Sequence, residues 1–252
     1  AQAALARAAP LLGLGRMRRC LVPVPGLVPR PRSRAIFDTR AYYDRVFGEL
    51  GAGEVLEWYN ADWSDLEPLL APFVALRGAE PPRRLLDLGC GTSQLAVQLA
   101  GSTISRSLRV VVGVDVSPAA AAVQQAALAA AAGRPPGGPR LLFRTADAVV
   151  GLPFRRGAFG LVVEKGFIDA LNSTARGRGK VPAALAEAWR VLSPGGVLLS
   201  VSQSQASHCR AGLFEEAGLS PPPLEARELP GLPERGVRCY RAVKPPAPTF
   251  GQ

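Results

Sequence analysis

The sequence has few of the side chains that commonly bind metals in proteins. It holds one histidine, His208, and four cysteines, none of which forms a Cys-x-x-Cys pair. This composition does not support a zinc site, which needs several nitrogen and sulfur ligands at close spacing. Scattered cysteines of this kind are typical of a reducing compartment. We therefore expect no metal centre in this chain.

Long hydrophobic runs are also missing, and acidic residues are missing from the first 34 positions. No apolar stretch approaches the roughly 20 residues that a membrane span requires. The first 34 residues carry seven arginines, and the rest of the chain holds 23 basic and 20 acidic residues. Most of the formal net charge of +10 therefore belongs to this segment. The folded body is nearly balanced in charge, so we expect no nucleic acid as a partner.

The basic N-terminal segment predicts a targeting function. Arginine-rich segments without acids are typical of mitochondrial transit peptides, and a basic tail without any such role is the alternative. Prolines at four positions between residues 20 and 34 predict a linker. We expect a leader and linker over residues 1–37, one domain over 38–244 and a flexible tail over 245–252. The predicted location is the mitochondrial matrix.

The remaining length predicts one α/β domain. Hydrophobic residues make up 48 % of the chain, enough for a substantial core. Two helical patterns between residues 38 and 76 precede a regular alternation of apolar strands and helices, which is typical of a doubly wound parallel sheet. We predict a seven-stranded, mostly parallel, Rossmann-like sheet with an N-terminal helical extension. Its strands are expected near residues 84–88, 109–114, 140–144, 159–163, 196–201, 224–229 and 237–243.

A glycine-rich turn follows the first of these strands. In Asp87-Leu88-Gly89-Cys90-Gly91-Thr92, the two glycines let the backbone approach a ligand where a Cβ atom would collide. The second strand ends in Asp115, which is placed to accept hydrogen bonds from the two hydroxyls of a ribose. A turn whose glycines serve packing alone would not explain two acidic strand ends. The pattern predicts a nucleoside site at the carboxyl edge of the sheet.

Two nucleoside cofactors are compatible with such a site, a dinucleotide and S-adenosylmethionine. A dinucleotide fingerprint has a third glycine, at the position that Gln94 holds here. Asp87 fits poorly beside a pyrophosphate. It fits well beside the cationic methionine end of S-adenosylmethionine, in direct contact or through water. The sequence therefore favours S-adenosylmethionine.

Acidic residues also follow the third and fourth strands. Asp147 is placed to accept a hydrogen bond from an adenine amino group, with Ala148 as a wall of the ring pocket, although Asp147 could instead cap the next helix. Glu164 ends the fourth strand, where we expect it to hold the methionine ammonium, orient an amine or take its proton. Asp169 is a second candidate catalytic carboxylate, unless it serves only as the acid of a helix start.

An aromatic pair, Trp58 and Tyr59, lies between the two N-terminal helical patterns. Such a pair is compatible with plain core packing. The functional alternative is a lid over the cofactor or over the channel of the acceptor.

Taken together, these segments resemble those of the class I, seven-stranded methyltransferases. The Glu-Trp-Tyr segment at 57–59 and the Glu-Lys-Gly segment at 164–166 are similar to those of the protein-lysine methyltransferases, which include enzymes that act on elongation factor 1A and on mitochondrial citrate synthase. The resemblance covers about residues 40–243. It is carried by residues 86–93, 113–117, 147–148 and 164–166.

This resemblance implies a role for each candidate residue. Asp87, Gly89 and Gly91 would surround the methionine part of S-adenosylmethionine, Asp115 would hold the ribose, and Asp147 with Ala148 would hold the adenine. Trp58 and Tyr59 would contribute to the cofactor lid or lysine channel, and Glu164 stands where relatives often have aspartate.

The implied reaction is methyl transfer to a lysine of a protein substrate, suspected to be citrate synthase. The fold alone does not choose the acceptor, so a different protein or a small molecule is an alternative. A non-catalytic, methyltransferase-like binding subunit is another. The complete set of Asp87, Asp115 and Asp147 argues against such a subunit, because a dead site need not keep them.

Overall fold

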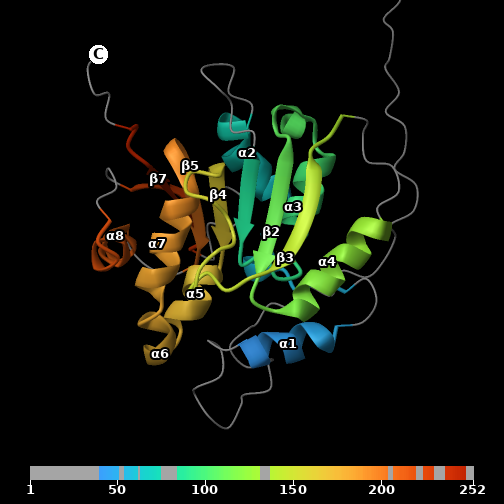
Figure 1. Cartoon of the computed structure of the whole chain (residues 1–252), viewed down its shortest axis with the longest axis horizontal. Coiled ribbons are helices and arrows are strands. Elements are labelled where there is room, and N and C mark those ends of the chain that lie inside the picture. Colours follow the sequence, from blue (N-terminus) through green and yellow to red (C-terminus); the bar gives the residue numbers. More distant parts are fainter. Residues whose placement is uncertain are drawn as a thin grey trace, which may run out of the picture.

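A seven-stranded sheet forms the centre of the protein, in the order β3-β2-β1-β4-β5-β7-β6 (Figure 1). The computed structural model describes residues 40–50, 54–61, 63–74, 84–130, 137–203, 207–219, 224–229 and 236–247. The predicted leader at 1–37 and the end of the predicted tail, at 248–252, lie outside these residues. The strands are β1 (Arg84–Leu88), β2 (Val110–Asp115), β3 (Arg140–Thr145), β4 (Phe159–Lys165), β5 (Leu192–Ser202), β6 (Glu225–Glu228) and β7 (Arg238–Val243).

Every strand pair from β3 to β5 is parallel, whereas β7 runs antiparallel to both β5 and β6. The prediction of a seven-stranded, mostly parallel sheet is therefore confirmed. Because β1 lies between β2 and β4, the chain reverses its direction of winding beside β1. In sheets of this kind, ligands bind outside the carboxyl ends of the strands at such a reversal.

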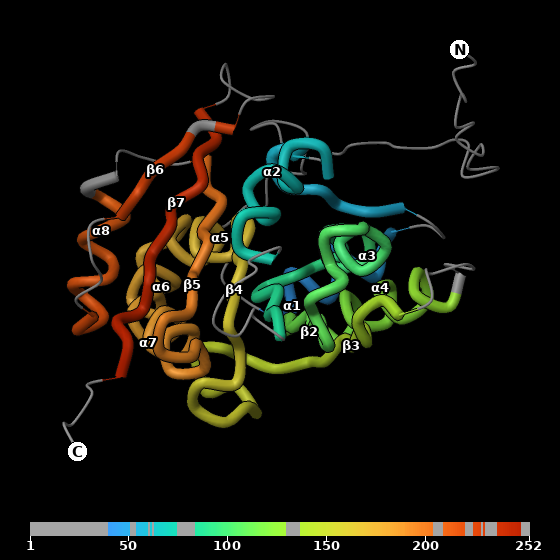
Figure 2. The backbone as a smooth tube through the Cα atoms, turned by 90° about the horizontal axis from the view of Figure 1, so that it is seen from above, coloured from blue at the N-terminus to red at the C-terminus, as the bar shows by residue number. Residues whose placement is uncertain are grey.

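Helices cover both faces of the sheet (Figure 2). The larger apolar cluster on one face includes residues of α2 (Trp63–Val74) and α3 (Leu95–Gly101), with α4 (Pro118–Ala130) beside them. The cluster on the other face includes residues of α5 (Phe167–Asn172), α7 (Val181–Val191) and α8 (Ser207–Glu216). Two short 3₁₀ helices, η1 (Trp58–Asn60) and η2 (Thr103–Ser107), and the four-residue helix α6 (Ala175–Arg178) complete the described elements. None of these helices is both long and apolar enough to cross a membrane.

The first helix, α1 (Arg40–Gly48), lies below the carboxyl ends of the strands (Figure 1). The ring of Phe47 approaches Gly91 so closely that a Cβ at that glycine would lie 3.1 Å from it. Asp44 accepts a hydrogen bond of 2.5 Å from the Ser117 hydroxyl at the start of α4. The N-terminal extension thus covers the edge of the sheet where the nucleoside site is predicted.

The residues of β4 alternate between the two faces of the sheet, as strand geometry requires. Val163 belongs to the cluster packed by α2 and α3, whereas Val162 belongs to the cluster packed by α7 and α8. Lys165 consequently faces the α2 and α3 side, and Glu164 faces the α8 side. These two neighbouring charged residues are therefore separated by the sheet.

The structure departs from the sequence analysis at β5, which begins at Leu192 and not near residue 196. The pairing with β4 shifts there, because Leu192 is opposite Phe159 while Val197 is opposite Leu161. The Ser-Pro-Gly-Gly segment at residues 193–196 therefore lies inside this strand as an irregular segment, with Gly195 at a φ of +73°. The short helices η1, η2 and α6 have no repeating apolar stripe that would predict them from sequence, whereas α5 has Asp169 in its first turn, as the helix-start alternative for that residue expects.

Candidate active site

The glycine loop, residues 89–94, follows β1 and is fixed by neighbours on two sides. Gly89 and Gly91 have left-handed φ angles of +68° and +48°, which favour glycine. The backbone N–H groups of Gly89 and Cys90 donate to the Val114 carbonyl at 2.8 and 3.0 Å, tying the loop to the end of β2. The loop backbone is therefore held in a defined shape at the point where the sheet changes its direction of winding.

A buried glutamine of α4 supports the same loop. The Gln124 Nε2 donates to the carbonyls of Gly91 and Ser93, at 3.1 and 2.6 Å, and the residue is fully enclosed. The sequence analysis missed Gln124. The signal that could have found it is its position as a polar residue inside an alanine-rich helix, where an apolar residue would otherwise be expected.

Two carboxylates lie at the ends of β1 and β2, Asp87 buried and Asp115 partly buried. Asp87 is 2 % exposed, and its Oδ2 has no hydrogen-bond partner among the described residues. Asp115 accepts hydrogen bonds of 2.9 Å from the N–H of Gly91 and from the N–H of Ser117. Burial, followed by the negative charge of Asp115, raises the pKa of Asp87 to about 7. Burial also raises the pKa of Asp115.

Neither carboxylate forms a salt bridge within the described part of the chain, so their charge is not balanced by the protein there. An unpaired buried charge is unfavourable unless a ligand compensates it. The site thus suits a cationic ligand. The free oxygen of Asp87 fits the cationic methionine end of S-adenosylmethionine, and a carboxylate with one donor on each oxygen, as in Asp115, can still accept ribose hydroxyls.

Asp147 and Ala148 follow β3 along the same edge. Asp147 Oδ1 accepts a hydrogen bond of 2.8 Å from the N–H of Val149, which shapes the turn after the strand. Ala148 is 4 % exposed and belongs to the apolar cluster on the α7 side. The register pairs Asp115 with Thr145, so Asp147 lies just beyond the end of β2 as well. The three acidic strand ends therefore occupy consecutive positions along one edge.

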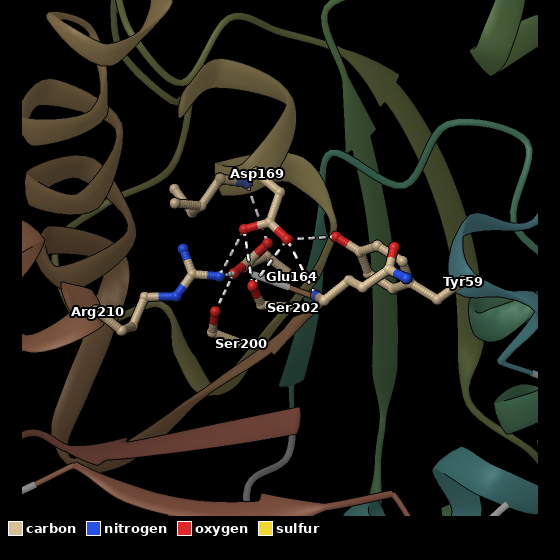
Figure 3. Close-up of polar contacts among 8 residues, drawn as sticks. Tyr59, Glu164, Asp169, Ser200, Ser202 and Arg210 are labelled. Atoms are coloured by element: carbon tan, nitrogen blue, oxygen red, sulfur yellow. Dashed lines mark hydrogen bonds and ion pairs between the residues drawn. The ribbon is translucent and has the colours of Figure 1, made fainter. Parts of the chain in front are cut away.

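Glu164 and Asp169 meet in an acidic cluster with Arg210, Ser200 and Ser202 (Figure 3). Arg210 Nη2 lies 3.1 Å from Asp169 Oδ1 and 3.6 Å from Glu164 Oε1. The Ser200 hydroxyl and the Ile168 N–H both donate to Glu164, which is 1 % exposed. Burial raises the pKa of Glu164, and the Arg210 charge opposes this shift.

Two carboxylates of the cluster share one guanidinium, so the acidic cluster carries a net negative charge when both are ionised. Glu164 makes its contacts with this cluster and not with the glycine loop. Arg210 and the two serines were not among the predicted site residues. Sequence gives no signal for them, because they reach the cluster from β5 and α8, more than 30 positions away.

Tyr59 links the predicted lid to the cluster. Its hydroxyl donates to Asp169 Oδ2 at 2.6 Å, and the Ser202 hydroxyl and the Gln203 N–H donate to the same carboxylate. Burial, then the charge of Asp169, raises the pKa of Tyr59 above its ordinary value. Tyr59 has a φ of +65° and is the one non-glycine residue of the described chain with a positive φ. Such strain, about 1–3 kcal/mol, often occurs at functional sites.

Trp58 and Tyr59 also pack on the backbone at the end of β4. A Cβ at Gly166 would lie 3.1 Å from the Tyr59 Oη and 3.4 Å from the Trp58 ring. On the other side of the same turn, a Cβ at Gly89 would lie 2.6 Å from the Cβ of Phe167. The aromatic pair, the end of β4 and the glycine loop therefore form one closely packed unit.

The raised pKa of Asp87 predicts how the stability of the ligand-free protein depends on pH. Between the ordinary carboxyl pKa near 4 and about 7, the folded state retains a proton that the unfolded state releases, so stability falls as pH rises through this window. Above pH 7 the folded state carries the full destabilisation caused by the ionised, buried Asp87 carboxylate. The Asp87→Asn variant lacks this penalty, so we expect it to unfold at a higher temperature than wild type at pH 8, with a smaller difference at pH 5.

Thermal unfolding without added ligand, followed at pH 5 and pH 8, measures this effect. A wild-type protein that is the more stable of the two at pH 8 would contradict the assignment of Asp87 as an uncompensated buried charge.

Comparisons with known proteins agree with this geometry. The sequence matches the family described as "Methyltransferase domain" over residues 86–200. Citrate synthase-lysine N-methyltransferase, mitochondrial, from Homo sapiens is 35 % identical over 188 residues, which cover 69 % of this chain and 75 % of that protein. EEF1A lysine methyltransferase 4 from Mus musculus is 30 % identical over 171 residues, which cover 65 % of this chain and 60 % of that protein.

Among solved structures, an S-adenosylmethionine-dependent methyltransferase from Methanosarcina mazei superposes with a TM-score of 0.53 at 17 % identity. The match covers 71 % of this chain and 98 % of that one, and at this identity it bears on the fold alone. The family match and the human relative reach further, since the match spans residues 86–200 and the relative is 35 % identical over 69 % of this chain and 75 % of its own length. The chain therefore belongs to the class I, seven-stranded methyltransferases, and S-adenosylmethionine is its cofactor, as its glycine loop and acidic strand ends predicted.

Proposed function

We propose that the chain is a protein-lysine N-methyltransferase and that mitochondrial citrate synthase is its substrate. The observation that carries this proposal is the contact between the 57–59 and 164–166 segments, which are far apart in sequence. Lys165 pairs with Glu57, and Gly166 packs against Trp58 and Tyr59. The names of the human and mouse relatives, which denote lysine methyltransferases, support the choice of acceptor.

On the cofactor side, we assign the three acidic strand ends to the three parts of S-adenosylmethionine. Asp87 would balance the cationic methionine end, Asp115 would accept the ribose hydroxyls, and Asp147 with Ala148 would hold the adenine. Gly89 and Gly91 give the loop its left-handed backbone, and Phe167 and Phe47 fill the space that their Cβ atoms would need. When bound, the cofactor supplies an electrophilic methyl group on a positively charged sulfur.

On the acceptor side, the acidic cluster and the aromatic pair would receive the lysine. The net negative charge of the cluster attracts an ammonium group, and Trp58 and Tyr59 supply apolar and aromatic surface for its aliphatic stem. A free lysine has a pKa near 10.4, so the amine must lose a proton before it can act as a nucleophile. Asp169, bonded to Tyr59, is the carboxylate that we assign to orient the amine and to take up this proton.

Glu164 would act through the cluster. Because the side chain of Glu164 is 1 % exposed and that of Asp169 is 14 % exposed, we assign Glu164 to hold the guanidinium that also binds Asp169. In this assignment Glu164 positions Asp169, while Asp169 and Tyr59 meet the substrate. The protein thus contributes positioning and the exclusion of water more than it contributes new bonds.

The substrate proposal predicts a mass gain on citrate synthase. Purified protein, S-adenosylmethionine and folded citrate synthase should yield citrate synthase heavier in steps of one methyl group, as measured by mass spectrometry. The gain should disappear when the modified lysine is changed to arginine.

Elongation factor 1A, incubated in parallel, tests the main alternative. Methylation of elongation factor 1A or of another protein, with citrate synthase unmodified, would overturn the substrate assignment. The assignment of lysine methyltransferase activity would stand. Methylation of small molecules alone would overturn both.

We also propose that the protein works in mitochondria, directed there by residues 1–37. Seven arginines without an acid support an import segment, and the human relative is named as mitochondrial. Fused behind an initiator methionine to a fluorescent reporter, these residues should direct the reporter to mitochondria. The same segment with its seven arginines changed to glutamine is the control and should leave the reporter in the cytosol. A diffuse signal from the unchanged segment would contradict the proposal.

A further inference from the structure

Lys165 is a buried charge that the proposed reaction does not use. Its side chain is 3 % exposed, and it lines a small cavity whose other walls, among them Leu66, Leu70 and Val163, are apolar. Burial lowers the pKa of its ammonium to about 7. Its one ion-pair partner among the described residues is Glu57, which contacts the ammonium directly and favours its charged form.

Glu57 also binds the glycine loop. Its Oε1 accepts a hydrogen bond of 2.9 Å from the Ser93 hydroxyl, and its Oε2 accepts one of 3.2 Å from the Gln94 N–H. Gln94 immediately precedes α3 and provides no side-chain cap. Glu57 binds its N–H from 37 positions away. One position earlier, the Leu56 N–H donates to Thr92 Oγ1 at 2.9 Å. The segment before the aromatic pair is thus bonded along the glycine loop.

Glu57 therefore joins three parts of the site with one carboxylate. Through Ser93 and Gln94 it binds the glycine loop, and through Lys165 it binds the end of β4. Along its own backbone it leads directly into Trp58 and Tyr59, which pack on Gly166 beside Lys165. A shift of this carboxylate would move the aromatic pair, Trp58 and Tyr59, relative to the glycine loop.

We propose that Glu57 and Lys165 are positioning residues for methyl transfer, and that their ion pair fixes the position of the aromatic pair relative to the glycine loop. Neither residue touches the reacting atoms in this proposal, which rests on the proposed function given above. Lys165 acts on the acceptor side alone, through the turn at Gly166. Glu57 acts on both sides, because it also binds Ser93 and the Gln94 N–H of the glycine loop.

The two residues should therefore affect the two substrates differently. Lys165→Met keeps the length of the side chain and removes its charge. We expect it to lower kcat/KM for the protein acceptor by about tenfold or more, because small misplacements of reacting groups cost up to about a hundredfold in rate. The Kd for S-adenosylmethionine, measured by calorimetry, should stay within about threefold of wild type. Lys165→Arg, which retains the charge, should recover part of the lost acceptor kinetics.

At position 57, glutamine and alanine separate the two functions. Glu57→Gln keeps an oxygen for the Gln94 N–H and loses the ion pair, so it should resemble Lys165→Met. Glu57→Ala loses both, so it should also weaken cofactor binding by at least about fivefold. The double variant Glu57→Gln with Lys165→Met leaves no unpaired buried charge. Its kcat/KM for the protein acceptor should therefore be no lower than that of the less active of the two single variants.

Glu187→Gln is the matched control. Glu187 pairs with Arg190 on α7 at 2.7 Å, and its side chain is 20 % exposed, against 15 % for Glu57. Loss of this pair should lower the unfolding temperature but leave both kinetic constants within about twofold. All assays are performed at least ten degrees below the unfolding transition of the least stable variant, so that loss of folded protein does not contribute.

A readout without an acceptor keeps the positioning proposal separate from the proposed function. With Trp63→Phe and Trp189→Phe in place, Trp58 is the single tryptophan. Lys165→Met should expose its indole ring, so that acrylamide quenches the Trp58 fluorescence more strongly. If no protein is methylated by wild type, the proposed function fails, while this quenching and the cofactor affinity of Glu57→Ala still test the ion pair. Acceptor kinetics of Lys165→Met within twofold of wild type, or unchanged Trp58 quenching, would overturn the positioning proposal.

Discussion

Buried negative charge at the carboxyl edge of the sheet is the constraint on which the site depends. Asp87 and Asp115 end neighbouring parallel strands with no basic partner in the described structure, and burial raises the pKa of both carboxyls. Beside them, Asp169 and Glu164 share the single guanidinium of Arg210. A folded protein tolerates such an excess when ligands of opposite charge complete it. The methyl donor and the lysine ammonium are both cationic, and transfer of the methyl group leaves the donor's sulfur neutral.

The N-terminal extension packs over this edge of the sheet. Helix α1 brings Phe47 onto the glycine loop, and the segment from Leu56 to Tyr59 bonds to the loop and to the end of β4 in turn. Tyr59, whose backbone has a strained, positive φ, donates a hydrogen bond to Asp169. The sheet therefore supplies the charges, while the extension supplies the aromatic surface and the exclusion of water that methyl transfer to an amine needs.

Local rules of sequence were sufficient to predict the sheet and its acidic edge. Asp87, Asp115 and Asp147 follow apolar strands directly, and the carboxyl ends of parallel strands lie at the same edge, so their neighbourhood could be foreseen. The tight turn at the glycines could also be foreseen, but the side chains that exclude a Cβ there, Phe167 at Gly89 and Phe47 at Gly91, could not.

The partners of Glu164 could not be predicted in this way. Strand β4 is apolar on both faces, so alternation does not reveal which of Glu164 and Lys165 faces which helix layer. Only the packed structure puts Glu164 beside Arg210 of α8 and Lys165 beside Glu57. The same holds for Gln124, whose hydrogen bonds run to a loop 31 and 33 positions earlier. Long-range polar pairing of this kind has no local sequence signal.

Cofactor binding by the Asp115→Ala variant tests the central claim most directly, because the ribose assignment depends on that one carboxylate. Titration of the purified protein with S-adenosylmethionine by calorimetry should give clear binding by wild type and a Kd at least about tenfold higher for the variant. Hydrogen bonds to a charged group contribute about 1.5–3 kcal/mol, and 1.4 kcal/mol corresponds to tenfold in Kd. Circular dichroism should show the variant folded. A folded Asp115→Ala variant that binds S-adenosylmethionine as tightly as wild type would contradict the account.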